Sequence, residues 1–71
     1  MILTLNDVGS KPTLVITNGS KTLLKRRGKS IVSLLKFVME NTTKQNVKDS
    51  IISLEKILPF MRNSITKIEV K

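Results

Sequence analysis

Residues 13–24 read TLVITNGSKTLL and contain the clearest structural signal in the chain. The two halves, Thr13–Thr17 and Ser20–Leu24, are rich in β-branched and other apolar residues that favour strands. Asn18 and Gly19 separate them, and an Asn-Gly pair suits the two positive φ angles of a type I′ turn. The segment therefore predicts a β-hairpin.

Further strands are predicted towards both ends of the chain. Ile2–Leu5 is a short apolar run followed by a loop that contains glycine and proline. Ile65–Val70 alternates along its length, so Thr66, Ile68 and Val70 share one face. The sequence thus predicts four strands, with the last one separated from the first three by a long central region.

The first part of that central region predicts a helix over residues 31–39, capped by Ser30 after a break at Gly28. Its apolar residues cover most of the helix circumference. The centre of this arc and its two sides are formed by Ile31, Leu34, Leu35, Val38, Val32, Phe37 and Met39. So wide an apolar arc predicts a helix that is packed on more than one side.

A second helix is predicted from Thr42, whose spacing to Gln45 fits a capping box. One apolar stripe follows at helical spacing, formed by Val47, Ile51, Leu54 and Leu58. Pro59 disfavours helix at the residue before it. The helix therefore either stops there or kinks and continues to Asn63.

The predicted order is β-β-β-α-α-β, which indicates a small α+β fold and a single domain over residues 1–71. A strand that returns after two helices most simply rejoins the sheet, which leaves both helices on one sheet face. The alternative is a winged-helix-like arrangement, with the helix pair as a helix-turn-helix and the hairpin as its wing. The four-residue link 41–44 is compatible with that alternative.

The composition points to anionic partners and away from catalysis. Lys and Arg number 13 against 5 Asp and Glu, which gives a net charge of +8. Histidine and cysteine are absent, which excludes histidine acid/base chemistry, thiol chemistry, disulfides and the usual zinc sites. The acidic residues are dispersed, and no histidine can activate the serines. We therefore expect a non-enzyme with no metal site and no cofactor.

The strongest functional signal is a basic cluster between the predicted hairpin and the first helix. Five cations occur within nine positions with no acid among them: Lys21, Lys25, Arg26, Arg27 and Lys29. Ser30 adds a hydroxyl at the helix N-terminus, where free N–H groups favour a phosphate. The basic cluster predicts phosphate contacts, although a charge run of this kind is also typical of a solvated surface.

Two weaker features lie on the second predicted helix. Lys44 and Lys48 are one turn apart and would assist phosphate binding, but Glu55 lies along the same line. Ile52 lies away from the apolar stripe, and a single exposed isoleucine is ordinary. If the helix continues past the proline, Phe60 joins Ile52 in a patch suited to a protein partner or to a homodimer.

Two functions follow from these features. The first is a small nucleic-acid-binding regulator of transcription or replication. DNA is favoured over RNA because the chain has two phenylalanines and no tryptophan or tyrosine with which to stack bases. The alternative is a non-enzymatic protein-binding module, an inhibitor or accessory subunit that docks on an acidic surface of a larger machine.

The expected location is the cytoplasm, or the host cytoplasm if the gene is viral. The chain has no basic signal-peptide start, no membrane-spanning apolar run and no cysteine. No membrane partner is therefore expected. Its small size and its content of Lys, Asn and Ile are typical of phage and mobile-element genes.

Overall fold

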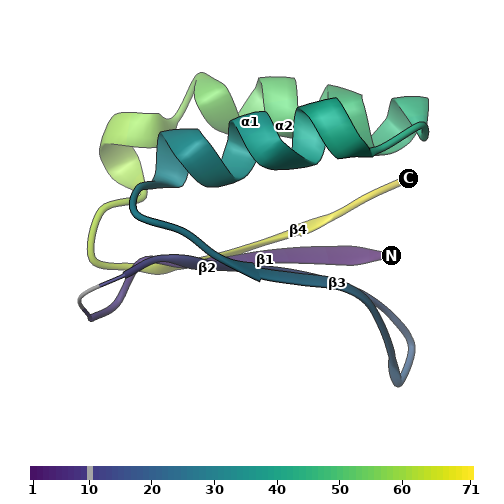
Figure 1. The fold of residues 1–71 in the computed structure, drawn as a ribbon, viewed down its shortest axis with the longest axis horizontal. Helices are drawn as coiled ribbons and strands as arrows, with labels where there is room; N and C mark the ends of the chain where they lie inside the picture. The colour runs from purple at the N-terminus through teal and green to yellow at the C-terminus, as the bar shows by residue number, and fades with distance from the viewer. Residues whose placement is uncertain (10) are drawn as a thin grey trace.

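Four antiparallel strands form one sheet, and two helices cover one face of it (Figure 1). The computed structural model describes residues 1–9 and 11–71; Ser10, in the predicted loop before the second strand, lies outside the described residues. The elements are β1 (Ile2–Asn6), β2 (Thr13–Asn18), β3 (Lys21–Arg27), α1 (Ile31–Asn41), α2 (Gln45–Glu55), the 3₁₀ helix η1 (Leu58–Phe60) and β4 (Ile65–Glu69). The predicted α+β fold and its β-β-β-α-α-β order are confirmed.

The strands lie in the order β3-β2-β1-β4, so the last strand rejoins the sheet beside the first. This topology excludes the winged-helix-like alternative, because the hairpin is no separate wing: both of its strands belong to the sheet that the helices cover (Figure 1). Strand alternation directs Leu3 and Leu5 of β1, and Leu14 and Ile16 of β2, towards the helices, where all four are buried. The opposite sheet face is uncovered (Figure 1).

The predicted hairpin forms, but its turn is one residue later than the sequence indicated. Asn18 still pairs with Lys21 in the sheet, so the turn consists of Gly19 and Ser20. Gly19 has a φ of 63°. Ser20 does not have a positive φ, because Asn63 is the single described non-glycine residue that does. A glycine with positive φ at the first turn position is typical of type II′, so the type I′ assignment is wrong.

β3 ends at Arg27, three residues beyond the predicted end at Leu24. Its pairing with β2 shifts between Ile16 and Thr17, which leaves Leu23 as an additional residue on β3. Such a bulge bends a strand and increases its twist. The tip of the β2–β3 hairpin accordingly bends away from the helix layer, towards the uncovered side of the sheet (Figure 1).

The predicted cap of α1 is confirmed, because the Ser30 side chain accepts a hydrogen bond from the backbone of Ser33. The buried residues of α1 are Leu34, Leu35 and Val38, with Phe37 and Met39 packed beside them. Val32 is 61% exposed, so the buried arc is narrower than predicted. The sheet and α2 contact only part of the apolar circumference of α1.

α2 begins after Lys44, and the predicted capping box of Thr42 and Gln45 is wrong. The Thr42 hydroxyl accepts from the Lys44 backbone, and the Gln45 amide donates to Asp49 instead. The predicted apolar stripe is buried at Val47, Ile51 and Leu54.

α2 stops at Glu55 and does not continue through Pro59, which lies in the first turn of η1. A proline lacks the backbone donor that a continuing α-helix needs, so the chain turns here. This turn brings Met61 into the core, where it is 1% exposed. Within the described residues, neither helix has the length and apolar character needed to cross a bilayer.

Candidate anion-binding surface

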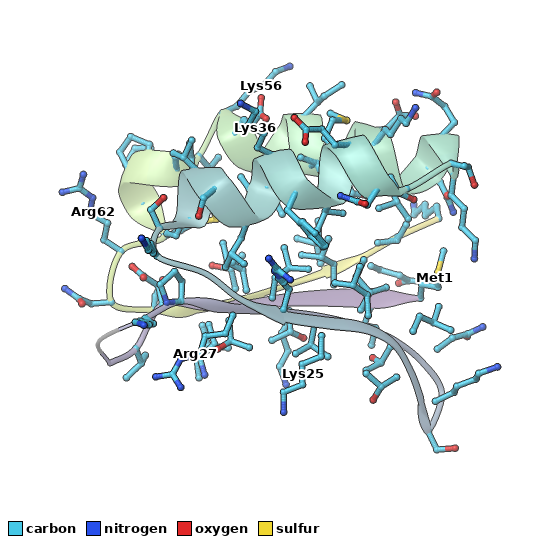
Figure 2. The ribbon with its side chains drawn as sticks, in the orientation of Figure 1. Met1, Lys25, Arg27, Lys36, Lys56 and Arg62 are labelled. Atoms are coloured by element: carbon cyan, nitrogen blue, oxygen red, sulfur yellow. The ribbon has the colours of Figure 1, made fainter. Side chains whose placement is uncertain are left out.

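The basic cluster lies largely on β3 and not on a loop, and this strand divides it between the two sheet faces. Arg26 pairs with the buried Leu14 and lies on the helix side, whereas Lys25 and Arg27 pair with residues of the other face. Figure 2 shows Lys25 and Arg27 extending from the face opposite the helices. The sequence pattern did not predict this division because it indicated a strand end at Leu24.

A groove of about 510 Å³ lies between the end of β3 and α1. We call it the basic groove, because in the described part of the chain its charged lining consists of five cations and one carboxylate: Lys11, Arg26, Arg27, Lys29, Lys36 and Glu40. The cations come from the loop before β2, from β3, from the β3–α1 connection and from α1. Folding therefore concentrates positive charge beyond what the linear cluster contains.

Lys11 and Lys36 were not predicted as site residues. Lys11 is brought to the groove by a hydrogen bond of 3.1 Å from the Gly28 backbone N–H to the carbonyl of Pro12. This bond joins the loop before β2 to the connection that carries Lys29. Lys36 lies on the polar side of α1, and the amphipathic pattern alone does not say which edge of the helix borders β3.

Gly28 allows α1 to approach the end of β3 closely. A Cβ atom at this position would lie 2.8 Å from Cδ2 and 2.9 Å from Cγ of Leu34, whose side chain is buried. Real side chains do not approach this closely without a shift of one partner. The absence of a side chain at Gly28 thus allows Leu34 to pack closely against the β3–α1 connection at the basic groove.

Arg26 is held in the basic groove by an aromatic ring. Its guanidinium carbon lies 4.2 Å from the centroid of the Phe37 ring, within the range of a cation–π interaction. The contact fixes one cation of the groove between β3 and α1. It also covers the ring face that would otherwise be free to stack on a nucleic-acid base.

At the N-terminus of α1, the cap uses the backbone N–H of Ser33, which is one of the donors that the sequence predicted for a phosphate. The Ser30 hydroxyl accepts from the Ser33 backbone at 3.2 Å, and the Ser33 hydroxyl accepts from the Ser30 backbone at 3.3 Å. Both hydroxyls thus satisfy backbone donors within the helix. Ser30 also lines a different groove from Lys29, which remains in the basic groove.

The other predicted cations lie outside the basic groove. Lys21 is exposed at the hairpin tip, opposite Asn18. Lys44 is exposed immediately before α2, and Lys48 is half-buried on its first turns. None of these three lysines lines the groove, so the binding site proposed from the structure does not include them.

The predicted protein-interface pair does not share one helix. Ile52 is 44% exposed on α2, and Phe60 is 82% exposed on η1, beyond the end of α2. A second groove of about 670 Å³ instead lies between η1 and the start of α1, where the exposed Val32 borders Leu58 and Pro59. The apolar pattern placed Val32 in the packed arc, so this surface was not predicted.

Compared with protein families, with curated proteins and with solved structures, this chain matches none of them. The described residues also contain no group of three acidic, histidine or cysteine side chains placed to hold a metal ion. Function is therefore inferred from the geometry and charge of the chain itself.

Proposed function

We propose that this protein binds nucleic acid and that its basic groove holds part of the phosphate backbone. The observation that carries the proposal is the lining of this groove, in which, among the described residues, cations from four separate segments lie with a single carboxylate, that of Glu40. Lysine and arginine side chains supply most phosphate contacts in nucleic-acid complexes. The net charge of +8 adds a long-range attraction for a polyanion.

The spread of these cations favours a polymer over a small anion. A site built for one small anion usually encloses it with buried polar donors. Among the described residues no polar or charged side chain is buried, and the five cations of the basic groove are all exposed. Exposed cations that line an open groove are suited to the repeated charges of a phosphate backbone. Binding of this kind is consistent with a regulator of transcription or replication.

A salt series tests this proposal directly. Affinity for duplex DNA is measured by fluorescence anisotropy across several salt concentrations, for the wild type and for the pair Lys29→Ala with Lys36→Ala. We expect a linear decrease of affinity in log–log terms for the wild type. The slope should be lower by about two in the variant, because each removed lysine leaves about one phosphate without its cation.

The matched control is the pair Lys44→Ala with Lys56→Ala, which removes the same charge from the helix layer, outside the basic groove. Its affinity and slope should stay close to the wild type. Absence of binding to duplex DNA, single-stranded DNA and RNA at low salt would reject the proposal. Equal reductions of affinity in both pairs would show that overall charge, and not the basic groove, drives binding.

A protein-binding module is the second candidate, favoured by exposed apolar side chains on η1 and in the second groove, which Val32 lines and Phe60 does not. Phe60 is 82% exposed and Val32 is 61% exposed. Large exposed apolar side chains near a groove are typical of interaction surfaces. In this case Phe60→Asp would abolish the interaction with a purified partner, while the Lys29→Ala and Lys36→Ala pair would leave it unchanged.

A further inference from the structure

The sheet face opposite the helices has a charge pattern of its own. The strand register places Lys25, Val15, Thr4 and Lys67 side by side in one row across the four strands. The row on one side of it contains Arg27, Thr13, Asn6 and Ile65. The row on its other side contains Thr22, Thr17, Ile2 and Glu69. This open face therefore carries three cations and one acid, with threonine as its commonest residue.

The tip of the β2–β3 hairpin is the part of this face that extends from the body of the protein, because residues 13–17 of β2 are flanked by β1 (Figure 1). The tip bends towards the uncovered side of the sheet, at the bulge formed by Leu23 (Figure 1). The major groove of DNA, about 12 Å wide, admits a two-stranded β-ribbon. Two paired strands lie only about 5 Å apart, so the hairpin tip, which begins where the pairing with β1 ends at Thr17, has the dimensions of such a ribbon.

The side chains on the open face of the hairpin match the chemistry of the major groove. Thr13, Thr17 and Thr22 offer hydroxyl and methyl groups, which contact base edges and the thymine methyl. Arg27 is exposed on the same face, but at the end of β3 that is farthest from the tip, where it also lines the basic groove. Lys25 is placed between them in the adjacent row.

Lys67 lies on the opposite edge of the sheet, three strand spacings from Lys25 in the same row. That separation is about 14 Å, which exceeds the width of the major groove. A ribbon inside the groove would therefore leave Lys67 above the phosphates that border it. At the other side, the cations of the basic groove continue from Arg27, which belongs to both surfaces.

The aromatic residues favour a duplex over a single strand. Single-strand binders stack bases on exposed rings, and both phenylalanines of this chain lie outside the open face. Phe37 is on α1 under Arg26, and Phe60 is on η1. The A-form RNA duplex has a major groove too deep and narrow for side chains to read, which leaves duplex DNA as the ligand.

We infer that the open sheet face reads duplex DNA, with the tip of the β2–β3 hairpin in the major groove and the basic groove on the adjoining phosphates. This inference rests on the proposed function and adds the ligand, the groove and the element that enters it. It assigns base contacts to Thr17 and Thr22, which flank the bulge, and phosphate contacts to Arg27 and Lys67.

The test compares three variant pairs that each remove two cations: Lys25→Ala with Lys67→Ala on the open face, Lys29→Ala with Lys36→Ala in the basic groove, and Lys44→Ala with Lys56→Ala on the helix layer. The probes are a short duplex DNA, the matching single strand and the matching RNA duplex. All six lysines are exposed, and thermal melting verifies the fold of each pair.

We expect the open-face pair to weaken duplex DNA binding by about tenfold or more and to lower the salt slope by up to about two. The helix-layer pair should change neither. If the basic-groove pair weakens binding while the open-face pair behaves like the helix-layer pair, the inference is wrong and the proposed function stands. If the wild type binds no nucleic acid, both are wrong.

A modified duplex tests the groove assignment separately. Glucosylated 5-hydroxymethylcytosine places a bulky sugar in the major groove and leaves the phosphates unchanged. We expect the wild type to bind this duplex at least about tenfold more weakly than the unmodified one. Equal affinity for the two duplexes, or affinity for the single strand or the RNA duplex as high as for duplex DNA, would overturn the assignment.

Discussion

The two faces of the sheet use the same strands for opposite purposes. On the helix-covered face Leu3, Leu5 and Leu14 are at most 1% exposed and form the core with the helices. On the open face Lys25 and Lys67 border a row of small side chains. Alternate residues of one strand thus contribute either to the core or to the charged surface. Substitutions on one face should therefore change stability, and substitutions on the other should change surface charge without changing stability.

In β3 the helix side of the strand is not entirely apolar. The helix side of the strand carries Leu24, which packs on the core, and then Arg26, which covers Phe37. β3 is also an edge strand, and charged side chains on an edge protect it from pairing with other chains. Its positive charges therefore have a structural use as well as the proposed contact with phosphate.

The largest expected effect contrasts neighbouring residues of β2. Leu14→Ala removes a fully buried side chain and should cost about 2–5 kcal/mol of unfolding free energy. Val15→Thr, on the open face, should cost less than about 1 kcal/mol. Urea denaturation measures both. Similar destabilisation of the two variants would show that the open face is covered in solution.

A second prediction concerns the approach of α1 to β3. Gly28→Ala introduces a Cβ at 2.8 Å from the Leu34 side chain and should cost about 1–3 kcal/mol by overpacking. The control is Lys29→Ala, which should change stability by no more than about 0.5 kcal/mol. An unchanged urea midpoint for Gly28→Ala would contradict the close packing at the groove.

A third prediction tests the hairpin turn. Gly19→Val should cost about 1–2 kcal/mol because a β-branched residue resists the positive φ of 63°. The open space around Gly19 leaves backbone strain as the cause. Ser20→Ala, the control, should leave the stability nearly unchanged. Thermal melting measures both variants. A larger destabilisation by Ser20→Ala than by Gly19→Val would reject the type II′ turn.

The smallest effect separates the two arginines of β3. Arg26→Ala should cost about 0.5–1 kcal/mol because it removes the cation–π interaction with Phe37. Arg27→Ala, on the open face, should stay within about 0.5 kcal/mol of the wild type. A double-mutant cycle with Phe37→Leu isolates the Arg26 interaction, and zero coupling would contradict it.

The fold was predictable because its signals are local. Apolar and β-branched runs indicated the first three strands, and alternation indicated the last. Helical spacing indicated the buried residues of both helices, and Ser30 marked the start of α1. The turn was misplaced by one residue because Gly19 can supply positive φ in more than one turn type. The bulge at Leu23 also arose from pairing between strands, which local propensity does not describe.

The candidate site was only partly predictable, because it depends on contacts distant in sequence. Arg26, Arg27 and Lys29 were predicted from their clustering and do line the basic groove. Lys11 reaches it through the hydrogen bond between Gly28 and Pro12, and Lys36 through the orientation of α1. Neither contact can be predicted from the order of charged residues in the sequence.

Backbone amide NMR during titration with duplex DNA tests most directly whether the basic groove binds nucleic acid. Binding there predicts the largest chemical-shift changes at β3, Lys29 and Lys11, with little change at Phe60 and the rest of η1. These changes should diminish as salt increases. Shifts confined to η1 and the start of α1, or no shifts at low salt, would contradict binding through the basic groove.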